Sequence, residues 1–150
     1  MRLDEGKVII DNKEIYDGMD SGSFKKLFST DVNGYINGSI ERENFKSPKM
    51  IEGLLFWVKI IFKNNIISSI EIKNADSKLK NSYDNWCDDR VELKRKSHDE
   101  WLINNLGQPN ERRAVLLKYI YNWGNIVSYY DPKAGDSGIL ITYDRNDVDV

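Results

Sequence analysis

The side chains that could carry out catalysis in this chain include one thiol and one imidazole. Cys87 is the only cysteine and His98 the only histidine. A thiolate nucleophile needs a neighbouring base, so these two residues would form the sharpest catalytic dyad that the sequence offers. The opposite interpretation is favoured: His98 occupies the exposed first turn of a predicted helix, and Cys87 is a small packing residue. A single histidine also excludes a two-histidine metal site and a zinc-finger pattern within one chain.

Neighbouring carboxylates are the second chemical candidate. The pairs Asp88 with Asp89 and Asp144 with Asp147 could perform acid–base catalysis or bind a divalent cation. With 24 acidic residues in the chain, such neighbours are expected without a function. The glycine-containing stretch DGMDSGSFKK, residues 17–26, lacks the spacing of a phosphate-binding loop. The sequence therefore predicts no catalytic residue, no cofactor and no metal site.

Aromatic residues among carboxylates indicate a binding surface. The cluster comprises Tyr83, Asp84, Trp86, Asp88 and Asp89. Aromatic anchors contribute much of the energy of protein interfaces, and complementary charge accelerates encounter. We therefore expect this acidic-aromatic segment to suit a basic partner surface. The alternative stays open: the tryptophan could enter the core while the carboxylates only keep the segment soluble.

The aromatic-rich stretch at residues 119–143 has the spacing of two strands around a turn at residues 131–135. One parity is shared by Tyr119, Tyr121, Trp123, Val127 and Tyr129. We expect these rings to be buried, each stabilising the fold by roughly 1.5–3 kcal/mol. Tyr130 has the other parity and is predicted to point outward and to contact a partner. Gly124 and Gly138 interrupt the strands and indicate a bulge or the close passage of another backbone.

Shorter patterns predict the N-terminal elements. Residues 7–16 suit a hairpin, and residues 34–40 suit one strand. Between them, Ser21 or Ser23 could cap a helix whose apolar stripe consists of Phe24, Leu27 and Phe28.

Apolar residues occur at every second position most clearly from residue 56 to residue 72. Phe56, Val58, Ile60 and Phe62 share one face, Asn64-Asn65 forms a two-residue turn, and Ile66, Ser68, Ile70 and Ile72 continue the parity. Asparagine tolerates positive φ better than other residues with a side chain, and a primed hairpin turn requires positive φ.

A second helix is predicted from the capping-box pattern at residues 97–100. Ser97 would cap the helix, and Glu100 would reach back to it. Gly107 and Pro109 mark its end, since glycine adopts the left-handed conformation and proline prevents continuation. Residues 74–96 are then a polar connector.

These elements predict a single α+β domain over residues 1–150. Its antiparallel β-sheet would carry one or two short helices on one face. Each half contains a helix followed by a hairpin, which predicts pseudo-repeated halves at residues 1–73 and 97–143.

Composition narrows the function classes. The chain has 150 residues, 31% of them charged, and a formal charge of −2, so no basic field attracts nucleic acid. The longest strongly apolar stretch, residues 54–62, is interrupted by Lys59 and is far shorter than the roughly 20 residues of a membrane helix. The N-terminus has no secretory signal pattern. Together with a lone cysteine, these features predict a cytoplasmic protein.

The helix ending WLINNLGQP, the strand YIYNWGNIVSYYD and the hairpin to GILITY together resemble a known repeat unit. It is the unit of the β-lactamase-inhibitory-protein-like fold, which small outer-membrane assembly lipoproteins of the SmpA/OmlA type share. Two such units would cover residues 20–73 and 97–143. The lipid-attachment cysteine of the lipoproteins is missing here, so their envelope role is not implied. The resemblance implies a sheet surface that binds other proteins.

A looser similarity, in size, charge and lack of catalytic residues, is to bacterial toxin immunity proteins. We therefore expect a non-enzymatic domain that binds and neutralises a cognate toxin, with no nucleic-acid or membrane partner, and that is a monomer or homodimer when free. The alternative is a small hydrolase or ligand-binding protein with a carboxylate-lined cleft. The predicted partner contacts are Tyr83, Asp84, Trp86, Asp88, Asp89 and Tyr130.

Overall fold

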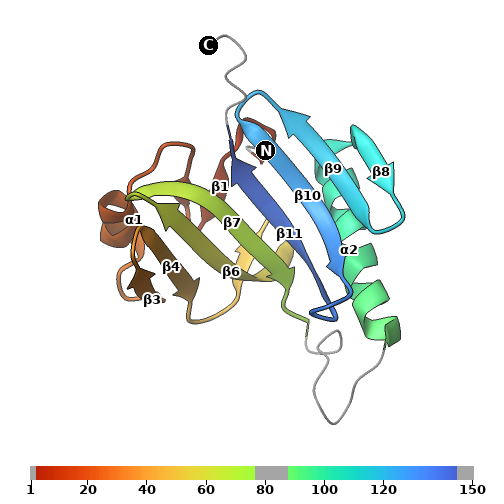
Figure 1. Ribbon diagram of the computed structural model, residues 1–150, viewed down its shortest axis with the longest axis horizontal. Helices are drawn as coiled ribbons and strands as arrows, with labels where there is room; N and C mark the ends of the chain where they lie inside the picture. Colours follow the sequence, from red (N-terminus) through yellow and green to blue (C-terminus); the bar gives the residue numbers. More distant parts are fainter. Residues whose placement is uncertain (1–2, 77–87, 145–150) are drawn as a thin grey trace.

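The computed structural model describes residues 3–76 and 88–144, with the backbone alone for residues 88–90. Two helices and one short 3-10 helix accompany the strands in this part of the chain (Figure 1). The N-terminal elements are η1 (Leu3–Glu5), β1 (Val8–Ile10), β2 (Lys13–Ile15), α1 (Ser21–Phe28), β3 (Val32–Asn37), β4 (Ile40–Phe45), β5 (Lys49–Ile51), β6 (Leu54–Lys63) and β7 (Ile66–Asn74). The C-terminal elements are α2 (Asp88–Leu106), β8 (Glu111–Arg113), β9 (Leu116–Tyr121), β10 (Gly124–Asp131) and β11 (Asp136–Tyr143).

The main sheet is antiparallel and has nine strands. Its order is β3-β4-β6-β7-β11-β10-β9-β8, and β5 pairs with β6 beside this path. Both helices pack on the same face, because α1 contacts Phe45 and Phe62 while α2 places Trp101 against Phe56. The predicted class, an antiparallel α+β fold with helices on one face, is confirmed, although α2 with 19 residues is not short.

The two halves meet at the centre of the sheet, where β7 pairs with β11. The register places Ile139 opposite Ile72 and Ile141 opposite Ile70, and all four are fully buried. Each half is a helix followed by antiparallel strands. That the halves are structural repeats stays a prediction.

The N-terminal hairpin is confirmed, with Val8 opposite Ile15. The predicted cap of α1 was wrong, because Asp20 caps this helix. Its backbone is extended (φ −88°, ψ 160°), and its Oδ1 accepts the Ser23 N–H at 2.6 Å. The buried apolar face of α1 is also narrower than predicted, since the Leu27 side chain is 38% exposed.

The predicted strand at residues 34–40 is in fact the end of β3, a turn and the start of β4. Asn37 pairs with Ile40, and Gly38 (φ 64°) occupies the first turn position, where a left-handed conformation is required. Periodicity does not reveal β4, because its inward-facing positions include two glutamates, which break the apolar alternation.

The β6–β7 hairpin is confirmed, and both turn residues have positive φ, 51° at Asn64 and 71° at Asn65. The predicted parity holds at Ile70 and Ile72, which are fully buried, but it fails at the start of β7, because the register shifts between Ile61 and Phe62. As a result Ile67 is buried, whereas Ile66 is 44% exposed.

Helix α2 ends as predicted but begins nine residues earlier, at Asp88 instead of Ser97. Gly107 (φ 82°) follows it, and its N–H donates to the Ile103 carbonyl at 2.9 Å. The Ser97 hydroxyl donates to the Lys94 carbonyl within the helix, so the capping-box pattern marks an internal turn. The predicted connector is correspondingly shorter.

The aromatic-rich stretch is split by a turn at residues 122 and 123, so that Tyr121 pairs with Gly124. The turn reverses the predicted parity on β10. Tyr119 on β9 faces the core, but on β10 the buried residues are Ile126 and Ser128. The expected close passage at Gly124 is confirmed: a Cβ there would lie 1.9 Å from the Thr142 carbonyl oxygen.

Candidate binding surface

In the described part of the chain, no element covers the face of the main sheet opposite the helices. Figure 1 views the sheet from this side, with α2 behind the strands. We call it the open face. Because directly opposed residues share a face, the register defines rows of side chains across it. One row is Asn44, Lys59, Glu71, Leu140, Val127, Lys118 and Glu111. A second row is Tyr35, Arg42, Ile61, Ser69, Thr142, Asn125 and Ile120.

Glu71 is the polar centre of the open face. Its Oε2 accepts the Tyr129 hydroxyl at 3.1 Å, and its Oε1 lies 3.8 Å from both Lys59 Nζ and Lys73 Nζ. Burial, together with the nearby Glu71 carboxylate, raises the pKa of Tyr129. The phenol is therefore neutral at physiological pH and acts as a fixed donor to Glu71.

Lys73 connects this centre to helix α2. Its Nζ donates to Asp136 Oδ2 at 2.9 Å, and Lys94 Nζ from α2 donates to Asp136 Oδ1 at 2.8 Å. Burial would raise the pKa of Asp136, but the hydrogen bonds from the two lysines outweigh it and lower the pKa to about 2. The carboxylate thus holds two strands and the helix together.

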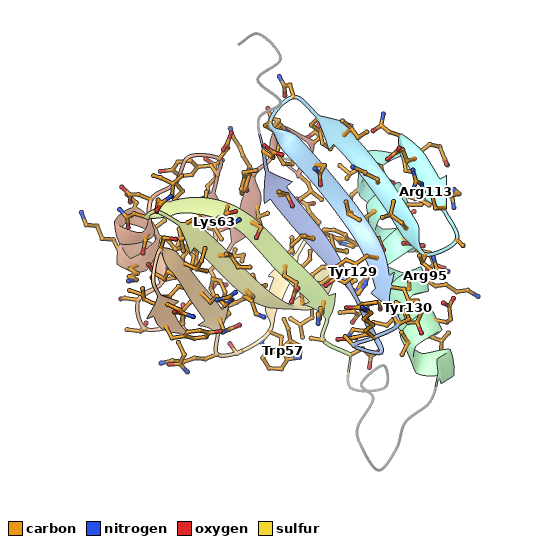
Figure 2. All side chains as sticks on the ribbon, in the orientation of Figure 1. Trp57, Lys63, Arg95, Arg113, Tyr129 and Tyr130 are labelled. Carbon is orange, nitrogen blue, oxygen red and sulfur yellow. The ribbon has the colours of Figure 1, made fainter. Side chains whose placement is uncertain are left out.

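Trp57 stands at the margin of the open face (Figure 2). It lines a concavity of this face. Its side chain is on the exposed face of β6 and is 47% exposed. The concavity has a volume of about 160 Å³ and is lined by Asn44, Phe45, Trp57, Val58, Lys59, Glu71 and Lys73. A half-exposed indole beside charged groups of both signs is an arrangement that suits contact with another protein.

The predicted acidic-aromatic segment is separate from the open face in the sequence. Tyr83, Asp84 and Trp86 lie outside the described residues, as do the side chains of Asp88 and Asp89. That binding segment stays a prediction, with the backbone of its last two residues at the start of α2.

The predicted orientation of Tyr130 was wrong. Alternation along β10 places Tyr130 with buried Ile126 and Ser128, on the helix side of the sheet, where it is half-buried. Tyr129 lies on the open face instead, opposite Gly138 on β11. The reversal follows from the turn at residues 122 and 123, where the sequence pattern predicts continuous strand.

His98 is buried and structural, contrary to the predicted surface position. Its Nε2 accepts the Asn74 N–H at 2.9 Å, which places the ring proton on Nδ1. Burial lowers the pKa of His98 to about 3, and the nearby Lys94 contributes to the shift. The neutral imidazole therefore joins α2 to the end of β7. Cys87, the other member of the predicted dyad, lies outside the described residues.

The carboxyl pair that the structure brings together is not one of those selected from the sequence. Glu41 and Glu43 on β4 point to the helix side and are 7% and 5% exposed. Glu41 accepts the Ser21 hydroxyl and forms an ion pair with Lys25, both at 2.8 Å. Burial and the adjacent Glu41 raise the pKa of Glu43 to about 7. The spacing of two glutamates in IERENF, within an alternating strand, was the available signal.

Glu43 occupies the space above a glycine. A Cβ at Gly34, directly opposite on β3, would lie 2.0 Å from Glu43 Oε2. A side chain at this position would displace the carboxyl group from its place above β3. Of the predicted pairs, Asp144 is described but Asp147 is not.

Metal-ligating clusters and membrane-spanning helices also bear on the kind of site. Among the described side chains, at residues 3–76 and 91–144, no group of three or more histidine, cysteine, aspartate or glutamate residues converges on a point where a metal ion could bind. Neither described helix combines the length and apolar composition that crossing a membrane requires.

No protein family, curated protein or solved structure matches the chain. Its function is therefore inferred from its own residues and geometry.

Proposed function

We propose that this chain is a non-enzymatic protein-binding domain and that it acts as a bacterial immunity protein, neutralising a cognate toxin in the cytoplasm. The observation that carries the proposal is the open face of the nine-stranded sheet, with half-exposed Trp57 beside its concavity. An immunity protein of this kind would act by covering the active site or the substrate-binding surface of the toxin.

The open face combines the properties of an interface. Ile120 is 44% exposed at one end and Trp57 is 47% exposed at the other, and a centre of ion pairs lies between them. Strands position these side chains more rigidly than loops, and a preorganised surface loses less conformational entropy on binding. Large aromatic side chains contribute a disproportionate share of binding energy.

The charges of this face favour a partner that also carries both signs. Lys59 and Lys73 flank Glu71, and Arg42 lies over the Tyr35 ring at 5.8 Å. A uniformly basic partner would meet these cations unfavourably. A basic partner was the expectation from the acidic-aromatic segment, so the two surfaces make different predictions about the toxin.

Substitutions on the two surfaces distinguish them. The tagged chain would be purified gently from its host and studied by native mass spectrometry. We expect a stoichiometric polypeptide partner that is lost with Trp57→Ala and retained with Tyr16→Ala, a matched control that is 39% exposed at the N-terminal hairpin. The triple change Asp84, Asp88 and Asp89 to Asn tests the acidic-aromatic segment.

Retention of the partner by Trp57→Ala and its loss from the triple variant would move the site to that segment. A lone wild-type chain under the same conditions would contradict the proposed function. The partner, once identified, provides the direct readout, which is inhibition of its toxic activity by the wild-type chain and weaker inhibition by Trp57→Ala.

One observation favours a second candidate, a small hydrolase. A carboxyl group with a pKa near 7, as at Glu43, can donate or accept a proton at physiological pH. The wild-type chain would be assayed against chromogenic esters, phosphodiesters and glycosides. This function requires an activity that Glu43→Gln abolishes and Trp57→Ala preserves. Against it, Glu41 is already engaged by Ser21 and Lys25.

A further inference from the structure

Strand β3 forms one outer edge of the main sheet, and its properties differ from those of the other edge. From Asn33 to Asn37 every residue is exposed, with Tyr35 at 57% and Ile36 at 66%. The strand VNGYIN contains no charged residue and no proline. The opposite edge, β8, has three residues, ERR, all charged. Charged, short edge strands resist pairing with another strand, whereas long uncharged ones invite it.

The backbone of β3 presents a regular set of free groups outward. Its two-residue turn makes Asn37 and Ile40 a hydrogen-bonded pair, and such pairs alternate along an antiparallel ladder. Val32, Gly34 and Ile36 therefore direct their N–H and C=O groups away from β4. No strand of the described chain pairs with this edge.

We propose that β3 pairs antiparallel with β3 of a second copy of this chain, around a two-fold axis at Gly34. The three outward-directed residues are spaced symmetrically about Gly34, so one register satisfies all of them in both copies. Gly34 then lies opposite Gly34 of the second copy, and Val32 lies opposite Ile36 of the second copy.

The side chains match in the same register. On the helix side, Ile36 packs against Val32 of the second copy, two β-branched residues that suit cross-strand contact. On the open side, Tyr35 meets Asn33 of the second copy. One residue beyond the strand, Asp31 meets Asn37 of the second copy, so no like charges are opposed. A self-complementary strand of this kind is what an isologous interface requires.

In the part of the chain that the structure describes, residues 33–37 of this edge are exposed. Helix α1 packs its Phe24 and Phe28 rings on Phe45 and leaves Ile36 66% exposed. Glu43 lies over Gly34 and therefore comes near the axis. Its raised pKa leaves it largely protonated at slightly acid pH, which limits repulsion between the two copies.

Sedimentation equilibrium of the full chain at slightly acid pH tests the pairing. We expect a monomer–dimer equilibrium in the micromolar to hundred-micromolar range. Ile36→Lys places a charge on the edge and should weaken dimerisation at least about tenfold. Ile36→Pro removes an outward N–H that β4 does not use, and should have the same effect. The matched control Ile120→Lys, at a residue 44% exposed on β9, should leave the equilibrium unchanged.

Disulfide trapping tests the register itself. In the proposed pairing Asn33 and Tyr35 of the second copy form a non-hydrogen-bonded pair, with Cα atoms about 4.5 Å apart, close enough for a disulfide. Asn33→Cys and Tyr35→Cys chains, each also carrying Cys87→Ser, should cross-link when mixed and oxidised. Neither chain alone should cross-link, because position 33 of one copy lies opposite position 35 of the other copy and not opposite position 33.

The circular dichroism spectrum and the urea midpoint of every variant would be compared with those of the wild-type chain, so that only folded variants are interpreted. A wild-type chain that stays monomeric throughout the range overturns the proposal. So does a dimer that Ile36→Lys and Ile36→Pro leave intact, or a cross-link formed equally by either cysteine chain alone. The proposal is independent of toxin binding, since Ile36 of the edge and Trp57 of the open face are changed in separate variants.

Discussion

Gly124 holds a position that no residue with a side chain fits. Its φ of 152° is unfavourable for such residues, and a Cβ there would lie only 1.9 Å from the Thr142 carbonyl oxygen, so strain and a backbone clash combine. We expect Gly124→Ala to destabilise the fold by at least about 2 kcal/mol. Urea unfolding followed by circular dichroism measures the change.

Gly53 provides the control for this substitution. It also has positive φ, 83°, but a Cβ there meets nothing within 4 Å. Gly53→Ala should therefore cost only the conformational penalty of about 1–2 kcal/mol. Equal effects of the two substitutions would show that the approach of Thr142 contributes nothing.

His98 should make the fold sensitive to acid. Its pKa is about 3 in the folded chain and about 6.5 when unfolded, so the unfolded state binds more protons between these values. Stability should therefore fall as pH decreases from 6.5 toward 3, with a slope of up to about 1.4 kcal/mol per pH unit. His98→Gln, which can still accept the Asn74 N–H, should lose this slope.

Comparing the wild-type and His98→Gln chains at each pH isolates the contribution of the imidazole. Glu43 acts in the opposite direction, because its raised pKa makes the folded state bind the extra proton between about 4.5 and 7. If the difference between the two chains were independent of pH, His98 would not be buried in its neutral form.

Asp136 connects elements that are distant in sequence. It joins Lys73 on β7 to Lys94 on α2, from its own position at the start of β11. We expect Asp136→Asn to destabilise the fold by about 1–2 kcal/mol, a modest value because the side chain is 34% exposed.

The pH dependence of this effect has a defined sign. The pKa of Asp136 is lowered to about 2, so its contribution is complete above about 4 and is lost as pH falls toward 2. Thermal unfolding at several pH values measures it. Asp131→Asn is a suitable control, because the hydrogen bonds of Asp131 are to N–H groups of its own turn. The Asp136→Asn and Asp131→Asn chains should have the same stability only at low pH.

At the scale of elements, local signals predicted well where packing agreed with them. The turn at Asn64 and Asn65 and the end of α2 at Gly107 both depend on residues that tolerate positive φ, which is a property of the residue itself. The start of α2 was mispredicted because Ser97 and Glu100 form a capping pattern inside a helix that extends back to Asp88. Contacts of α2 with the sheet, such as His98 with Asn74, stabilise the helical turn at residues 97–100, which the sequence pattern placed at the start of the helix.

At the scale of the whole molecule, the two proposals combine into a prediction about stoichiometry. A dimer paired through β3 would extend the sheet across two chains and present two open faces. We expect the complex with a toxin to contain two copies of each chain, and Ile36→Lys to convert it to one of each with unchanged affinity per site. Native mass spectrometry reports the composition, and calorimetry reports the affinity. A wild-type complex with one copy of each chain would contradict this stoichiometry but would agree with toxin binding by the open face.

The sequence by itself determined the class of fold, the central hairpin and the N-terminal hairpin, because alternation and turn residues act over a few neighbouring positions. Only the tertiary structure decided which faces Ile66 and Ile67 of β7 occupy, and which face each side chain of β10 occupies. A register shift between Ile61 and Phe62 changes the faces of Ile66 and Ile67, and a turn at residues 122 and 123 reverses the parity along β10. It also decided the candidate site, since the open face and the Glu41–Glu43 pair depend on which elements lie on each side of the sheet. Burial is set by contacts between distant segments, and the periodicity of one segment does not specify where its register shifts or which elements cover it.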